Sequence, residues 1–155
     1  MTFRIRGLDP APFRPLFGQP AAVLAAAGAE RHVADACPGF PDRIELIDAR
    51  PGETLLLVNY VHQPAANPYH ASHAIFVREG AGRAYDRVDE IPPALAIRPL
   101  SLRGFDAGDR LVAAELAAGE QQRAAIARLL GDRRVAYLQA HYARPGCYAA
   151  RIERA

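Results

Sequence analysis

Thr54-Leu55-Leu56-Leu57-Val58-Asn59-Tyr60-Val61 is the stretch that decides the fold. Leucine or valine occupies both odd and even positions, so both sides of an extended chain are apolar here. A strand with one solvated face would alternate apolar and polar residues. The segment therefore predicts a central strand covered on both faces.

Shorter runs typical of strands surround this segment, and turn residues separate them. Pro51-Gly52 predicts a turn that would pair 43–48 with 54–61 as a hairpin. Pairing of this kind is antiparallel. The expected strands are Thr2–Arg6, Arg31–Asp35, Arg43–Asp48, Thr54–Val61, Ala74–Arg78, Ala96–Phe105 and Arg110–Glu115, followed by a hairpin of Arg134–Tyr142 and Cys147–Glu153 through Pro145-Gly146.

Helix signals lie near both ends of the chain. Asp9-Pro10 predicts the start of a short helix, which Gly18 would end. The alanine-rich run from Pro20 to Gly28 predicts a second short helix. The apolar spacing of 119–130 predicts a third. No alternation of strand and helix suggests a parallel sheet. The expected fold is one α+β domain, residues 1–155, with a mostly antiparallel β-sheet and a few short helices packed on one face.

Composition excludes several classes of function. All 19 basic residues are arginine, so neither a lysine Schiff base nor a P-loop lysine can be present. The arginines are scattered and the net charge is only +2, which does not indicate nucleic-acid binding. No signal peptide, transmembrane segment or cofactor motif is recognisable, and Cys37 and Cys147 lack pairing spacing. We expect a cytoplasmic protein with free thiols, no membrane partner and no cofactor.

The segment from His62 to His73 concentrates reactive side chains. Pro64 and Pro68 stiffen it, and strands flank it on both sides. His62 and His73 would lie close together if those strands pair as a hairpin. Imidazoles titrate near neutral pH, at about 6.5, so this pair is the candidate acid and base. The alternative is a proline-stiffened surface loop whose histidines are solvated.

Candidate ligand contacts lie on this loop and on the strands beside it. Guanidinium groups on a rigid sheet bind a carboxylate or phosphate through two parallel hydrogen bonds. The sequence therefore predicts a small anionic ligand, although ion pairs with nearby glutamates are the alternative use of the arginines. The candidate contacts are Tyr60, Tyr69, Ser72, Arg78 and Arg43.

Two other classes of function stay open. His70 and His73, with His62 and either His141 or Cys147, could bind a metal, because imidazole and thiolate suit zinc. The loop has no acidic residue and the chain no HExxH motif, so we assign no metal ligand. The other class is a non-enzymatic module that binds a protein partner or forms a homo-oligomer.

Four segments resemble a known family of short bacterial proteins, the domain of unknown function 1203. The likeness covers essentially the whole chain. It implies a bacterial cytosolic protein and a whole-chain domain, but no activity. The segments are Pro38-Gly39-Phe40-Pro41, Tyr60-Val61-His62-Gln63-Pro64, Pro68–Glu79 and Pro145-Gly146-Cys147-Tyr148-Ala149-Ala150-Arg151.

Overall fold

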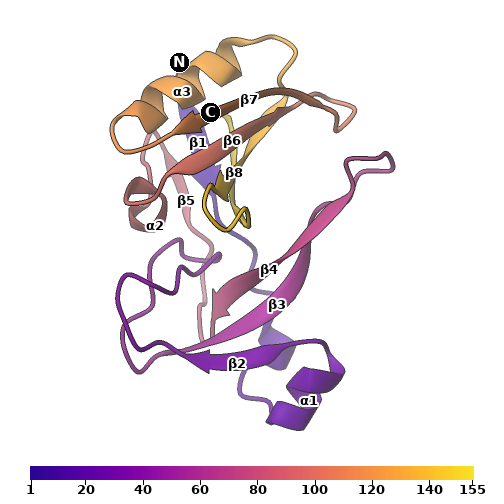
Figure 1. Ribbon diagram of the computed structural model, residues 1–155, viewed down its shortest axis with the longest axis vertical. Helices are drawn as coiled ribbons and strands as arrows, with labels where there is room; N and C mark the ends of the chain where they lie inside the picture. The colour runs from indigo at the N-terminus through magenta and orange to yellow at the C-terminus, as the bar shows by residue number, and fades with distance from the viewer.

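The computed structural model describes all 155 residues and contains two antiparallel sheets. The six-stranded sheet has the order β5-β1-β9-β8-β6-β7 and lies above the three-stranded sheet, β2-β3-β4, in Figure 1. The predicted α+β class is confirmed. The strands are β1 Phe3–Arg6, β2 Glu30–Val33, β3 Thr54–Gln63, β4 Ala71–Arg78, β5 Asp86–Val88, β6 Leu100–Phe105, β7 Leu111–Ala117, β8 Tyr137–Tyr142 and β9 Tyr148–Arg154.

Two helices cover one face of the six-stranded sheet. These are α3 (Gln121–Gly131) and the one-turn α2 (Pro93–Ala96). The buried residues of α3 recur at helical spacing, from Gln122 through Ile126 to Leu130, so one stripe of the helix packs on the sheet. No helix is long and apolar enough to cross a membrane.

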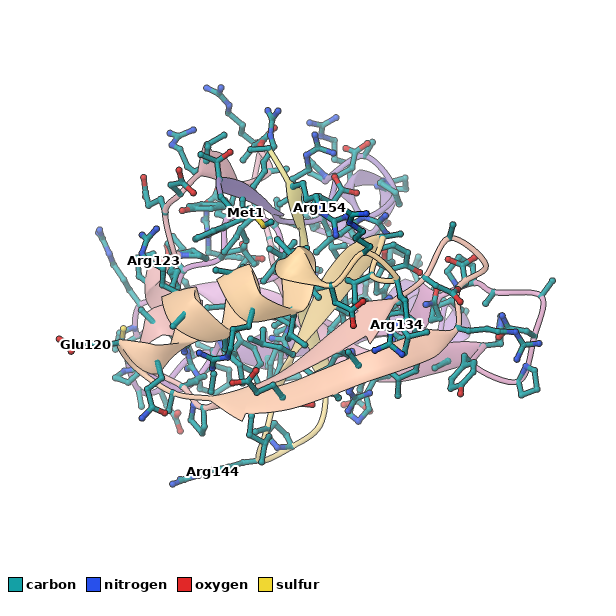
Figure 2. All side chains as sticks on the ribbon, turned by 90° about the horizontal axis from the view of Figure 1, so that it is seen from above. Met1, Glu120, Arg123, Arg134, Arg144 and Arg154 are labelled. Carbon is teal, nitrogen blue, oxygen red and sulfur yellow. The ribbon has the colours of Figure 1, made fainter.

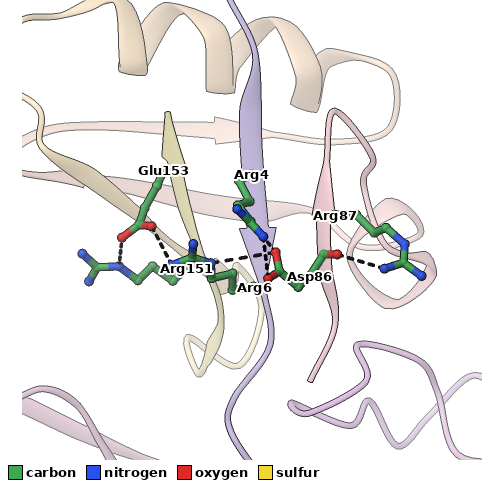
Figure 3. A network of polar contacts seen from close by, with 6 residues as sticks. All are labelled: Arg4, Arg6, Asp86, Arg87, Arg151 and Glu153. Carbon is green, nitrogen blue, oxygen red and sulfur yellow. Dashed lines mark hydrogen bonds and ion pairs between the residues drawn. The ribbon is translucent and has the colours of Figure 1, made fainter. Parts of the chain in front are cut away.

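The other face of this sheet carries a network of ion pairs, which we call the arginine ladder: Arg4, Arg6, Asp86, Arg151 and Glu153 (Figure 3). Arg4 pairs with Asp86, and Arg6 Nη1 lies 3.1 Å from Glu153 Oε2. Arg151 Nε donates to the same carboxylate at 2.6 Å. Each arginine of the ladder thus has a carboxylate partner.

Strand β3 is central in its sheet, as predicted, but only its first half is covered on both faces. Leu55 and Leu56 are completely buried, whereas Leu57 is half-buried and Val61 is 42% exposed. The reason is that β3 is ten residues long and its second half extends with β4 as a hairpin beyond the core (Figure 1). The core that packs on this three-stranded sheet is too small to cover all ten residues of β3.

The predicted strand 43–48 is wrong, and with it the hairpin through Pro51-Gly52. This stretch is a loop with a single bridge between Pro41 and Asp48. Its apolar residues Ile44 and Leu46 are fully buried, but in two different core clusters. The loop therefore connects the two sheets. Its alternating apolar residues look like a strand because Ile44 packs in one core and Leu46 in the other.

Smaller differences concern element ends. The region 96–105 begins as the end of α2, and its strand starts only at Leu100. Helix α1 (Ala21–Ala26) is confirmed, whereas 9–18 forms only a 3-10 turn, η1 (Arg14–Leu16). Strand β5 was not predicted because three residues are too few to show a pattern.

Candidate functional site

A cavity of about 500 Å³ lies where the two sheets meet. Its wall combines β4, which is an edge strand, with the loop 39–43, the segment 97–99 after α2, and the turn 142–147 between β8 and β9. Arg43 connects these elements, because its backbone N–H donates to the carbonyl oxygen of Phe76 on β4. The cavity is thus built from parts of the chain far apart in sequence.

Arg43 is only 2% exposed and forms no ion pair with a carboxylate. Its Nε donates to the carbonyl of Tyr148 at 2.8 Å, and Nη1 donates to the carbonyl of Pro41. Nη2 lies 3.1 Å from Sγ of Cys147. Asp48 is close enough to interact electrostatically with Arg43 but accepts no hydrogen bond from it. Burying a cation is costly, so further negative charge is favoured next to this guanidinium.

Tyr142 lies between two guanidinium groups on the cavity wall. The Cζ atoms of Arg43 and Arg98 are 4.8 and 5.2 Å from the centre of its ring. Its hydroxyl is buried and has no hydrogen-bond partner. Burial raises the pKa of Tyr142 to about 12. The phenol therefore stays protonated at neutral pH and is a donor without an acceptor.

The other two arginines of the cavity differ in their partners. Arg98 binds both oxygens of Asp48, at 2.6 and 2.8 Å. Burial would raise the pKa of Asp48, but hydrogen bonds from Arg98 and the Gly39 amide outweigh it and lower the pKa. Arg144 is exposed, forms no ion pair and projects from the turn (Figure 2). Of the three guanidiniums, only that of Arg98 is therefore paired with a carboxylate.

His73 is one of two predicted site residues that line the cavity; Arg43 is the other. Nδ1 of His73 lies 3.0 Å from the carbonyl oxygen of Ala74, so this nitrogen carries a proton and donates it to that carbonyl. Its Nε2 is left without a partner in the protein.

His62 lies outside the cavity. In the regular register of the β3–β4 hairpin His73 lies opposite Tyr60, and His62 is two residues further along β3, next to a β-bulge between Val61 and Gln63. The His62 ring instead stacks on Tyr148 at 5.5 Å. Burial is the main cause that lowers its pKa. The structure does not bring the two predicted acid-base groups face to face.

His62 belongs to a polar cluster between the sheets that the sequence did not reveal. Its Nδ1 lies 2.8 Å from Oε1 of Gln139, and Nε2 of His141 lies 3.1 Å from the same oxygen. Nδ1 of His141 lies 3.0 Å from the Gly146 carbonyl. Burial, followed by repulsion from Arg103, lowers the pKa of His141 to about 3. His141 is therefore neutral at physiological pH.

The other predicted contacts lie elsewhere. Arg78 pairs with Glu45 at 2.7 Å and Glu53 at 3.7 Å, which is the alternative use considered for it. Tyr69 and Ser72 are exposed, and Tyr60 packs against the Tyr148 ring. No three His, Cys, Asp or Glu side chains group closely enough to hold a metal ion. The metal-binding alternative therefore gains no geometric support.

The family resemblance was the one signal in the sequence that could have indicated this cavity. Three of the four segments that carry the family resemblance contribute to its wall: Pro38–Pro41, Pro68–Glu79 and Pro145–Arg151. The family model described as a protein of unknown function (DUF1203) matches residues 39–154. No curated protein and no solved structure matches the chain. The matched region includes every residue of the cavity wall.

Proposed function

The chain belongs to this family of unknown function, DUF1203, and we propose that it binds a small anionic molecule in the cavity between its two sheets. One observation carries the proposal. Arg43 is buried on the cavity wall without a carboxylate partner. A bound carboxylate or phosphate group would supply negative charge where the protein itself supplies too little.

The arginine ladder indicates that this shortage is local. On the exposed part of the sheet face opposite the helices, the three arginines share two carboxylates in a continuous network (Figure 3). No carboxylate lines the cavity, and Asp48, behind its wall, has both oxygens bound by Arg98. Arg144 stands at the rim with its donors unused. We therefore infer that Arg144 makes the first contact with the anion.

The size and lining of the cavity fit a small organic anion. Small-molecule sites span roughly 300 to 1,000 Å³, with mostly apolar walls and a few polar groups that fix orientation. Phe76, Ile97 and Pro99 provide apolar surface for a carbon skeleton. His73 contributes the unpartnered Nε2 and is the group that we retain for proton transfer. The expected setting is the bacterial cytoplasm.

Binding is tested by thermal unfolding and calorimetry with phosphate, sulfate, oxalate and pyruvate, at constant ionic strength kept with sodium chloride. An anion present at about 100 times its Kd stabilises the folded state by about 2.7 kcal/mol. This corresponds to a rise in Tm of about 5 to 10 °C for a chain of this size. The rise should saturate with concentration.

Two variants make the test specific to the cavity. Arg144→Gln removes the unpaired cation at the rim and should weaken binding about tenfold, the effect of losing one charge-assisted hydrogen bond. Arg133→Gln is the matched control, because Arg133 is exposed, has no side-chain partner and lies outside the cavity. Equal loss in both variants, or no saturable effect of any anion, would reject the proposal. Self-association without anion binding would favour the interaction-module alternative.

A further inference from the structure

The thiol of Cys147 occupies an unusual place in this cavity. Cys147 follows the Pro145-Gly146 turn and starts the return to β9. It is 7% exposed, forms no disulfide and lines the cavity. The other cysteine, Cys37, is exposed and does not line the cavity. The two thiols of the chain are therefore distinguishable by position.

Arg43 is the nearest charged group to the Cys147 sulfur, with Nη2 at 3.1 Å from Sγ. The Arg43 guanidinium donates a hydrogen bond to this sulfur, and a thiolate is the nucleophilic form of cysteine. His141 is not the base for this thiol, because its two ring nitrogens face Gly146 and Gln139.

Tyr142 supplies a second, independent feature of the same cavity wall. Its backbone N–H donates to the carbonyl oxygen of Cys147 at 2.9 Å, so the two residues face each other across the hairpin. Both side chains belong to the same core cluster and line the same cavity. The tyrosine hydroxyl is buried without a partner. Buried hydroxyls are normally hydrogen-bonded, so this group points to an acceptor supplied by a ligand.

We propose that Cys147 is a nucleophile that adds reversibly to a small carbonyl compound carrying a carboxylate, with the Tyr142 hydroxyl as donor to the carbonyl oxygen. This inference rests on the proposed anion cavity, since Arg144 would hold the carboxylate. The sulfur forms a bond to the carbonyl carbon, and the C=O π electrons move to the oxygen. That oxygen then takes a proton from solvent, which replaces the proton the thiol released. The product is a hemithioacetal, and no oxidant or reductant is needed.

The nucleophile is tested by alkylation in a Cys37→Ser background, where Cys147 is the only thiol. Iodoacetamide and iodoacetate each form a sulfur–carbon bond with loss of iodide, but only iodoacetate carries a carboxylate. At pH 7, Cys147 should react with iodoacetamide at least about tenfold faster than glutathione does, because only Cys147 has a guanidinium beside the attacking sulfur. The ratio of iodoacetate to iodoacetamide rates should also exceed that of glutathione. It should fall in Arg144→Gln and stay unchanged in Arg133→Gln.

The carbonyl step is tested with glyoxylate as the probe. Mass spectrometry should show that glyoxylate protects Cys147 from iodoacetamide at lower concentration than acetaldehyde, which has no carboxylate. Tyr142→Phe keeps the ring between the guanidiniums and removes only the hydroxyl, so it should raise the protective glyoxylate concentration about tenfold. Equal protection by both aldehydes, or an unchanged value in Tyr142→Phe, would overturn the assigned roles.

The outcomes separate this inference from the proposed function. If phosphate or pyruvate binds to the Cys147→Ser protein as it does to the wild type, while Cys147 reacts no faster than glutathione, the nucleophile is rejected and the anion cavity stands. If Cys147 reacts rapidly but without preference for iodoacetate, and no anion stabilises the protein, both the anion cavity and the carboxylate-bearing substrate are rejected.

Discussion

The arginine ladder and the cavity contain the same side chain in opposite electrostatic environments. In the ladder, Arg4 and Arg6 are partly exposed and paired with carboxylates on neighbouring strands (Figure 3). In the cavity, Arg43 is buried, and its donors reach two carbonyl oxygens and a sulfur. The number of arginines in the sequence therefore says little about function. The presence or absence of a nearby carboxylate separates structural arginines from those available to a ligand.

The largest difference between the cavity and the arginine ladder is expected in the free energy of unfolding when one arginine of each region is replaced. Arg43→Ala should lower the free energy of unfolding by about 3 to 5 kcal/mol, because it leaves buried carbonyl groups of Pro41 and Tyr148 without donors. Arg6→Gln in the ladder should shift Tm by less than about 2 °C, as exposed ion pairs contribute little. Urea unfolding of both variants measures these changes in the free energy of unfolding. Changes of similar size would contradict the difference proposed between the two regions.

A second test asks whether the cavity is open space or poorly packed core. Leu56 is fully buried in the core beside β4, whereas the next residue, Leu57, is half-buried and lines the cavity. Leu56→Ala should cost about 2 to 5 kcal/mol by leaving a void. Leu57→Ala should cost only about 1 kcal/mol, because an existing cavity merely becomes larger. If Leu57→Ala were as costly as Leu56→Ala, the cavity would be closed in solution.

The smallest expected effect concerns pH and the polar cluster between the sheets. His141 has a folded-state pKa of about 3 against an ordinary value of 6.5. Below pH 6.5 the unfolded chain binds a proton that the folded protein does not bind until about pH 3. The free energy of unfolding is therefore not reduced by His141 above pH 6.5, and it decreases as the pH falls below that value, by about 2 kcal/mol at pH 5.

Replacing His141 measures this contribution directly. The stability of wild type relative to His141→Gln should decrease by about 2 kcal/mol between pH 7 and pH 5. His70→Gln, at an exposed position, is the control and should leave the pH dependence unchanged. Burial raises the pKa of Asp42, so this carboxyl makes the protein more stable, not less, as the pH falls. Because Asp42 is present in both proteins, its effect cancels in the difference between them. A difference independent of pH would show that His141 is protonated in the folded state.

Local patterns explain which parts of the fold could be predicted. The apolar spacing of α3 and the Pro145-Gly146 turn between β8 and β9 depend on neighbouring residues, and both are confirmed. The loop 43–48 was mistaken for a strand because Ile44 and Leu46 alternate with polar residues. Their burial in two separate clusters cannot be distinguished, in a sequence, from burial on one face of a sheet.

The candidate site shows the same division. The sequence predicted Arg43 as a contact for an anion and His73 as an acid-base group, and both line one cavity. It also pointed to His62, which lies two residues beyond Tyr60, the residue opposite His73, and contacts Gln139 instead. Which residues of two strands lie opposite each other depends on the register of the hairpin. That register has no signature in composition or spacing.

The sequence by itself determined the α+β class, the central strand, the free thiols and the absence of lysine chemistry, because these follow from composition and short-range pattern. Only the tertiary structure decided which charges are compensated. Asp48 and Arg98 are 50 residues apart in the chain, and Arg43 and Cys147 are 104 apart. Electrostatic interaction depends on distance through space and on burial, which the folded chain sets. The contact between Arg43 and Cys147, from which the proposed chemistry follows, exists only because two sheets meet there.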